Sequence, residues 1–120
     1  MAKLLTGREA AAALTAALQH RCAALARRGV TPKLVILRCG GDEADGAYLR
    51  GALKRGTLCG VDVEVRSLPE NVPPQALLDA IDAVNGDASV HGCLLLRPLP
   101  PHLRTAEPDI CDRLLPEKDV

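Results

Sequence analysis

The fold of this chain is decided by residues 33–39, which read KLVILRC and are followed directly by Gly40 and Gly41. The apolar run is too short for a typical helix, and the two glycines end it as expected for a buried strand. Apolar residues at helical spacing occur both before and after it. The run therefore predicts a buried strand between two helices.

Helical and strand-like patterns alternate along the rest of the chain. Thr6 and Glu9 form a capping-box pair, after which apolar residues recur at helical spacing until Gly29. The later elements are expected in this order: a helix over 42–59, a strand over 61–68 near a sheet edge, a helix over 73–84 closed by Asn85 and Gly86, a strand over 90–96 and a short helix over 105–115. Such alternation implies a parallel sheet covered on both faces. We predict an α/β, three-layer domain with a small, mainly parallel sheet of three or four strands.

The composition fits one compact domain with an aliphatic core. The chain has 120 residues and is 48% hydrophobic, but Tyr48 is its only aromatic residue. Because 15 basic residues balance 15 acidic ones, there is no net field to attract a polyanion, and we expect no nucleic-acid partner. No apolar run is long enough for a membrane span and no apolar signal core opens the chain, which predicts a cytoplasmic protein without a membrane partner.

The cysteines and histidines form no recognisable metal or disulfide pattern. Five cysteines lie far apart, in odd number and without a C-x-x-C pair, so we predict neither a disulfide framework nor a zinc site. Their apolar neighbours favour packing as small hydrophobic side chains, although a reactive thiol is left open. His20, His91 and His102 have no carboxylate cluster at ligand spacing and are interpreted as surface residues.

Three loops are predicted to meet at one edge of the sheet. Ligands of open α/β sheets bind beyond the carboxyl ends of the strands, and this order of elements brings residues 40–48, 68–74 and 96–102 to that edge. The glycines of the first loop could suggest a phosphate cradle. The loop lacks the G-x-G-x-x-G order and carries acidic residues, so a flexible turn is the better interpretation. We expect Tyr48 to lie near this edge.

Four segments of the sequence stand out by their order and spacing. They are LTGR at residues 5–8, the strand, loop and helix from 35 to 60, GCLLLRPLP at 92–100, and PEKDV at 116–120. Together they resemble the N-terminal domain of the methylenetetrahydrofolate dehydrogenase/cyclohydrolase family, whose signature P-x-K-D-V-D-G is similar to the last segment. The resemblance implies that residues 1–120 are a folate-binding catalytic domain and that the NADP-binding Rossmann domain is absent from this chain.

The resemblance also implies roles for individual residues. The family shows S-x-x-Y-x-x-x-K here, with the Tyr stacked near the pterin and the Lys as the principal proton-transfer group. Tyr48 matches, whereas Asp45 stands at the Ser position and Ala52 at the Lys position. The family's V-Q-L-P-L-P motif has a Gln that orients the catalytic Lys, and Leu96 replaces it.

Further binding residues follow from the resemblance and from helix geometry. Pro98, Leu99 and Pro100 match the family's ligand loop, which favours that role over a simple strand end. Residues seven apart on a helix differ in direction by roughly 20°, so Arg55 returns to the side of Tyr48 and could hold an anionic ligand. Arg stays protonated and cannot alternate as acid and base. We assign Tyr48, Arg55 and this loop to substrate binding.

Two classes of function are open. The family oxidises 5,10-methylenetetrahydrofolate with NADP and hydrolyses the methenyl product to 10-formyltetrahydrofolate, in one-carbon metabolism. A non-catalytic folate- or small-anion-binding module, or a regulatory subunit, would account for Asp45, Ala52 and Leu96. Because no dinucleotide fingerprint occurs in the chain, we expect no cofactor here, and NADP only in the full-length family. We predict a folate-binding domain with impaired or no activity, with a folate-type ligand, no metal and an open oligomeric state.

Overall fold

The computed structural model of the chain describes residues 7–41, 43–97 and 99–120, without the side chains of residues 43 and 44. Its elements confirm the predicted α/β class, whereas Thr6, the expected helix cap, lies outside the described residues. The elements are α1 (Gly7–Arg27), β1 (Lys33–Cys39), α2 (Glu43–Cys59), β2 (Asp62–Leu68), α3 (Pro74–Asn85), β3 (Gly92–Leu95), the 3-10 helix η1 (Pro101–Ala106) and α4 (Glu107–Arg113).

The sheet is parallel and has the strand order β2-β1-β3. In the middle of β1, Ile36 lies opposite Val65 of β2 and Leu94 of β3. Because β1 is hydrogen-bonded on both sides and covered on both faces, residues 35–37 are fully buried. β2 is an edge strand, as its alternating pattern predicts.

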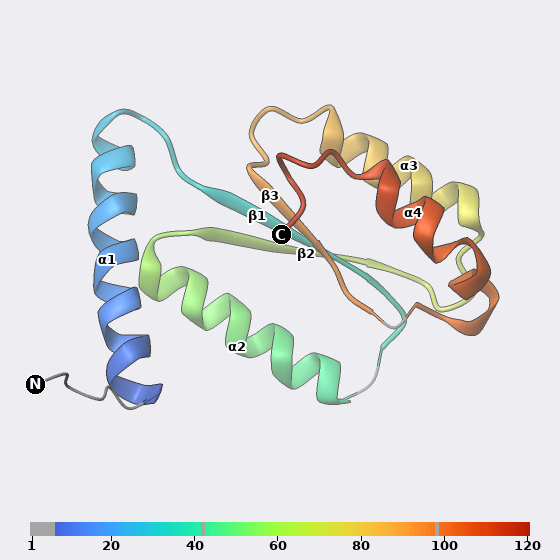
Figure 1. Cartoon of the computed structure of the whole chain (residues 1–120), viewed down its shortest axis with the longest axis horizontal. Helices are drawn as coiled ribbons and strands as arrows, with labels where there is room; N and C mark the ends of the chain where they lie inside the picture. The colour runs from blue at the N-terminus through green and yellow to red at the C-terminus, as the bar shows by residue number, and fades with distance from the viewer. Residues whose placement is uncertain (1–6, 42, 98) are drawn as a thin grey trace, which may run out of the picture.

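Helices cover both faces of the sheet (Figure 1). On one face lies α2, where Gly56 packs against Val63. On the other lie α3 and α4, where Leu37 and Leu77 belong to the main cluster of buried side chains. Successive side chains of a strand point to opposite faces, so the uninterrupted apolar run of β1 supplies both layers at once.

α1 lies outside these layers and packs against α2 (Figure 1). The Gln19 side chain donates to the Leu58 carbonyl oxygen at 2.9 Å. Only two of the 21 residues of α1 are buried, and Leu14 is 58% exposed. The helix is followed by Gly29 with φ of 77°, a left-handed helix end that the sequence predicts. Neither α1 nor any other described helix is long and apolar enough to cross a membrane.

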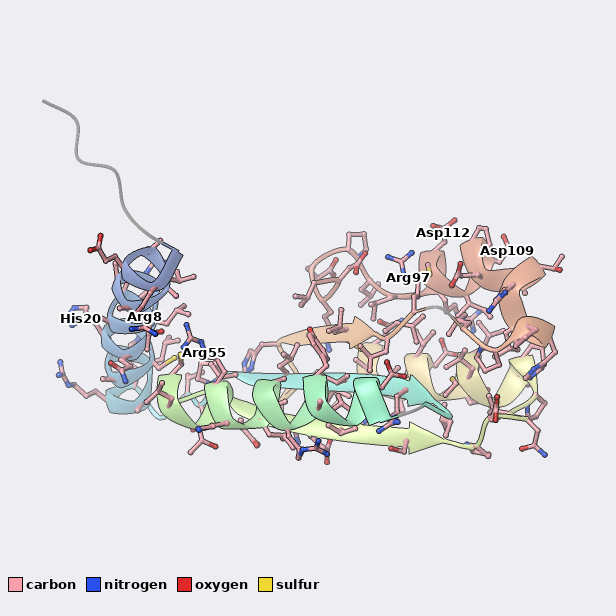
Figure 2. The ribbon with its side chains drawn as sticks, turned by 90° about the horizontal axis from the view of Figure 1, so that it is seen from below. Arg8, His20, Arg55, Arg97, Asp109 and Asp112 are labelled. Atoms are coloured by element: carbon pink, nitrogen blue, oxygen red, sulfur yellow. The ribbon has the colours of Figure 1, made fainter. Side chains whose placement is uncertain are left out.

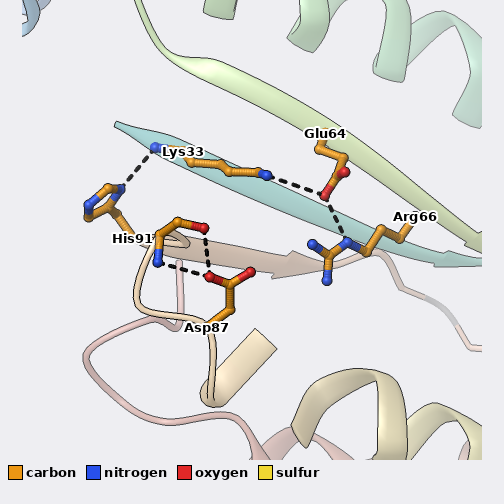
Figure 3. Close-up of polar contacts among 6 residues, drawn as sticks. Lys33, Glu64, Arg66, Asp87 and His91 are labelled. Carbon is orange, nitrogen blue, oxygen red and sulfur yellow. Dashed lines mark hydrogen bonds and ion pairs between the residues drawn. The ribbon is translucent and has the colours of Figure 1, made fainter. Parts of the chain in front are cut away.

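A polar network links the start of β1 to β2 and to the segment before β3 (Figure 3). Glu64 Oε2 lies 2.8 Å from Arg66 Nε and 3.8 Å from Lys33 Nζ. His91 Nδ1 accepts a hydrogen bond of 3.0 Å from the Lys33 backbone N–H. Ion pairs this exposed contribute about 0–1 kcal/mol each, so the network adds little to the stability of the fold.

The C-terminal part differs from the prediction of a single short helix over 105–115. A 3-10 turn begins at Pro101 and leads directly into α4. Pro101 suits the first turn because its fixed φ fits and its missing N–H would have had no partner there. β3 is also shorter than predicted, and beyond it Asp119 forms an isolated parallel bridge with Cys93. The sheet thus has three strands and one added bridge among the described residues.

Two glycines of α2 should respond in opposite ways to the same substitution. A Cβ at Gly56 would overlap a Val63 methyl group and lie 2.9 Å from the Val61 carbonyl oxygen, whereas a Cβ at Gly51 meets no atom within 4 Å. We expect Gly56→Ala to lower the free energy of unfolding by about 1–3 kcal/mol. Gly51→Ala should raise it by about 0.5–1 kcal/mol, because Ala favours helix. Urea unfolding measures both, and a stabilising Gly56→Ala would contradict the close packing of α2 on β2.

Candidate functional site at the carboxyl edge of the sheet

An open groove lies at the carboxyl edge of the sheet, where the three predicted loops meet. Its volume is about 300 Å³, and we call it the edge groove. Each predicted loop supplies part of its wall, together with the end of β1 and the start of η1. The lining residues are Cys39, Gly41, Asp45, Glu70, Leu99, Pro100, Pro101 and Arg104.

The turn after β1 is built around the side chain of Arg38. Arg38 Nε donates to the Gly40 carbonyl oxygen at 2.8 Å, and Gly40 and Gly41 have φ of 66° and 123°. A Cβ at Gly41 would overlap the Arg38 guanidinium, and a Cβ at Gly40 would lie 2.9 Å from Glu70 Cβ. Glycine is needed here because the turn is left-handed and closely surrounded. The chain's own side chains fill the space that a phosphate cradle would need.

Hydrogen bonds brace the wall of the edge groove that η1 forms. His102 Nε2 donates to the Val72 carbonyl oxygen at 2.7 Å, since a carbonyl can only accept. Arg104 Nε donates to the Leu99 carbonyl oxygen at 3.2 Å. These bonds tie η1 to the β2–α3 loop and to Leu99, which lies two residues before η1. His102, which the sequence suggested to be an ordinary surface residue, therefore helps to hold the groove in shape.

The edge groove combines apolar and charged surface. Pro101 supplies exposed apolar surface, and Leu99, which is 1% exposed, packs beneath it. Glu70 and Arg104 are exposed and Asp45 is half-buried. Such a surface can offer a small ligand apolar contact together with hydrogen-bond donors and acceptors. Sequence reasoning missed Glu70 and Arg104. The available signals were that Glu70 lies in a predicted edge loop and that Arg104 follows Pro101 by one 3-10 turn.

The structure brings some of the predicted site residues together. Asp45, Leu99 and Pro100 line the edge groove, whereas Pro98 lies outside the described residues. Tyr48 follows Asp45 by three residues on α2, so the two side chains are neighbours on the helix surface. The Tyr48 side chain is 54% exposed and is not part of the groove wall. Tyr48 thus presents an open aromatic surface beside the groove.

The two positions at which the resemblance implies a catalytic Lys and its Gln partner carry no polar side-chain atom. Ala52 lies one helical turn after Tyr48 and is half-buried. Leu96 is also half-buried and follows β3, where its N–H donates to the Leu37 carbonyl oxygen at 3.0 Å. Neither residue lines the edge groove. These side chains can supply apolar contact but no proton transfer.

The Arg55 side chain is engaged far from the edge groove. Its Nη2 donates to the Ala11 carbonyl oxygen of α1 at 3.4 Å. Figure 2 shows Arg55 beside α1, at the opposite end of the molecule from Arg97. Arg55 and Tyr48 point in similar directions around the helix axis, but seven residues also advance about 10 Å along that axis. The structure therefore does not bring Arg55 together with Tyr48.

Burial keeps three of the cysteine thiols in their protonated form. It raises the pKa of Cys39 and Cys111, and it raises the pKa of Cys93 to about 11. The thiolate is the reactive form, so these side chains are poor nucleophiles at neutral pH, in agreement with a packing role. Among the described residues, no three His, Cys, Asp or Glu side chains are grouped closely enough to hold a metal ion.

The sequence matches a known family along nearly its whole length. The family described as tetrahydrofolate dehydrogenase/cyclohydrolase, catalytic domain, matches residues 5–120. Relatives named bifunctional protein FolD share 38% identity over 120 residues in Alkaliphilus oremlandii and 40% over 119 residues in Thermus thermophilus. These matches cover 100% and 99% of this chain but 41% and 40% of the relatives. The chain thus spans about two-fifths of the length of the curated relatives it matches.

Solved structures share the fold described above. A 5,10-methylenetetrahydrofolate dehydrogenase from the silkworm Bombyx mori has a TM-score of 0.88 and 28% identity, over 99% of this chain and 41% of its own. A methylenetetrahydrofolate dehydrogenase-cyclohydrolase from Trypanosoma brucei, complexed with NADP cofactor and inhibitor, has a TM-score of 0.86 and 31% identity, over 98% of this chain and 40% of its own. Sequence and fold agree, and the chain therefore belongs to the tetrahydrofolate dehydrogenase/cyclohydrolase family, in which it corresponds to the catalytic domain.

Proposed function

We propose that this chain binds a reduced folate at the carboxyl edge of its sheet and does not by itself catalyse the family's reactions. The family match over residues 5–120 is the observation that carries the folate assignment. The absence of a proton-transfer group follows from Ala52 and Leu96, which stand where the resemblance implies a catalytic Lys and its Gln partner. The reactions concerned are the interconversions of 5,10-methylene-, 5,10-methenyl- and 10-formyltetrahydrofolate.

The described side chains suit a pterin between Tyr48 and the edge groove. The exposed ring of Tyr48 offers a stacking surface for a flat heterocycle. The carboxylates of Asp45 and Glu70 can accept hydrogen bonds from the N–H groups of the pterin edge, and Arg104 can donate to its carbonyl oxygen. Pro101, an exposed residue of the groove wall, can supply apolar contact, with the buried Leu99 packed behind the wall. Arg55 is not part of this site, because it is bound to α1.

We assign no nicotinamide cofactor to these 120 residues. Binding a pyrophosphate at a glycine-rich turn requires open space beside exposed backbone N–H groups. Here the side chains of Arg38 and Glu70 fill the space beside Gly41 and Gly40. The turn therefore does not fit NADP, which the T. brucei neighbour contains. In this proposal, residues 1–120 are the folate-binding part of a cytoplasmic enzyme system, and a dinucleotide-binding domain is not among them.

The second candidate function is a regulatory module that binds folate or a small anion without chemistry. What supports it is that Ala52 and Leu96 stand at the two positions where the resemblance implies a catalytic Lys and its orienting Gln. Both candidates predict folate binding. They differ in whether restoring the two polar side chains restores activity.

Tetrahydrofolate should stabilise the chain against heat, and Tyr48→Ala should reduce that effect by roughly half. We expect millimolar affinity, and a ligand at ten times its Kd adds about 1.4 kcal/mol to the free energy of unfolding. Losing the aromatic platform should reduce the affinity by about 3- to 10-fold. Thermal-shift titration measures both values.

Leu53→Ala is the matched control for this test, because Leu53 is a 40% exposed apolar residue of the same helix. It lies roughly 140° around the helix from Tyr48 and should leave the ligand-induced shift unchanged. An equal shift in wild type and Tyr48→Ala would remove Tyr48 from the site. No shift in any of the proteins would count against folate binding itself.

A further inference from the structure

The segment PEKDV, at residues 116–120, carries a contact that the proposed function does not use. Lys118 Nζ donates to the carbonyl oxygens of Val84 at 2.7 Å, Asn85 at 3.2 Å and Asp87 at 2.7 Å. Val84 and Asn85 are the last two residues of α3, and the final carbonyls of a helix have no partner within it. The Lys118 ammonium therefore caps the negative end of α3.

Two further contacts hold the same part of the chain on α3. Arg113 donates from Nε and Nη2 to the two carboxylate oxygens of Asp82, each at 2.7 Å. The Asn85 side chain donates to the Arg113 carbonyl oxygen at 2.8 Å and accepts from the Leu115 N–H at 3.0 Å. We call Asp82, Asn85, Arg113 and Lys118 the α3 clamp.

Residues 118–120, which follow most of the α3 clamp in sequence, pair with the outer edge of β3 (Figure 1). The Cys93 N–H donates to the Lys118 carbonyl oxygen at 2.7 Å, and the Val120 N–H donates to the Cys93 carbonyl oxygen at 3.2 Å. The side chain of Lys118 is thus fixed to α3 while its backbone is fixed to β3. The Lys118 ammonium has three N–H donors and no acceptor, which matches the three converging carbonyl oxygens. An apolar side chain of the same length cannot form these three hydrogen bonds.

We propose that Lys118 is a positioning residue for the ligand site: by capping α3 it holds residues 118–120 against β3 and so fixes the loop that carries Leu99 and Pro100. β3 ends at Leu95, only a few residues before that loop. Residues 119 and 120 also share the wall of a cavity of about 160 Å³ with the last residues of β3. The proposal has two consequences. The ligand consequence, an effect of Lys118 on ligand affinity, rests on the proposed folate function. The pairing consequence, an effect of Lys118 on the pairing of residues 118–120 with β3, does not.

The pairing consequence is tested by amide hydrogen exchange. Lys118→Met keeps the length of the side chain and removes the ammonium, so the Cys93 and Val120 amides should exchange at least about 10-fold faster. Lys54→Met is the matched control, because Lys54 is an exposed lysine of α2. It should leave both amides unchanged. Unchanged exchange in a folded Lys118→Met protein overturns the proposal.

The ligand consequence is tested by titrating tetrahydrofolate at a temperature where all variants are folded. We expect the Kd to rise about 3- to 10-fold in Lys118→Met and to stay constant in Lys54→Met. Faster exchange with an unchanged Kd overturns the positioning role. If wild type itself does not bind, the proposed folate function fails, and the exchange comparison still decides whether Lys118 fixes the strand.

A third measurement keeps the proposal falsifiable should Lys118→Met fail to fold. In the wild-type chain, NMR should show Lys118 Nζ hydrogens that exchange slowly with water, with couplings across hydrogen bonds to the carbonyl carbons of Val84 and Asp87. Lys54 Nζ hydrogens should exchange too fast to be observed under the same conditions. A Lys118 ammonium that exchanges as fast as that of Lys54 overturns the proposal.

Discussion

The chain will leave 5,10-methenyltetrahydrofolate to hydrolyse at its uncatalysed rate. General acid-base catalysis needs a titratable group within reach of the reacting carbon, and such a group typically contributes about 10²- to 10⁴-fold. Ala52 has only a methyl group, and Leu96 cannot orient a water molecule. Loss of methenyl absorbance, followed with and without the chain, measures the rate. Activity clearly above the uncatalysed rate in wild type would sink this expectation.

Replacing Ala52 by Lys and Leu96 by Gln should provide part of the rate enhancement that general acid-base catalysis contributes. Ala52→Lys places an amine roughly 40° around α2 from Tyr48, on the same side of the helix. We expect a gain of about 10-fold or more, and a larger gain when Leu96→Gln is added to orient the amine. Leu53→Lys is the control, because it adds the same charge one residue further on and faces another direction.

The outcome of this series also separates the two candidate functions. A gain in the double variant but not in Leu53→Lys identifies a catalytic site that has lost its proton-transfer group. If neither Lys-bearing variant gains activity while both stay folded and bind folate, Ala52 does not occupy the catalytic position, and the argument for the regulatory module from Ala52 and Leu96 is lost with it.

Leu77→Ala will lower the free energy of unfolding by about 2–5 kcal/mol, a large share of the stability of a typical small domain. Leu77 is 0% exposed and lies in the main buried cluster, between α3 and the sheet. The chain has no Phe or Trp, so this core is built from aliphatic side chains and Cys93. Because Ala is a strong helix former, the cost reflects lost packing and not lost helix propensity. Urea unfolding followed by circular dichroism gives the value.

Leu14→Ala is the matched control for the core substitution. Leu14 also lies in a helix, but it is 58% exposed, so we expect a change within about 0.5 kcal/mol. Equal losses in the two variants would mean that the buried cluster is not the main source of stability.

The order of elements was readable from the sequence because its signals are local. An apolar run that ends in two glycines is a strand whatever lies far away in the chain, and Pro73 followed by Pro74 starts α3 where the sequence predicts. The same reasoning failed after Pro101, where a 3-10 turn precedes α4. Residue patterns do not distinguish a short 3-10 helix from a short α-helix.

The candidate site was only partly readable. Asp45, Leu99 and Pro100 line the edge groove, because strand ends in a parallel sheet bring their following loops to one edge. Arg55 was placed by direction around the helix, and its distance along the axis carries it to α1. Glu70 reaches the groove only because its loop packs against the Gly40 turn.

The sequence by itself determined the α/β order and the family, because both depend on residue type and spacing alone. Only the tertiary structure decided which polar groups meet. His102 finds a carbonyl 30 residues away, and Lys118 finds three carbonyls, the nearest in sequence 31 residues away. The physical reason is that apolar periodicity acts between neighbours in the chain, whereas a hydrogen bond of fixed length depends on how distant segments are packed together.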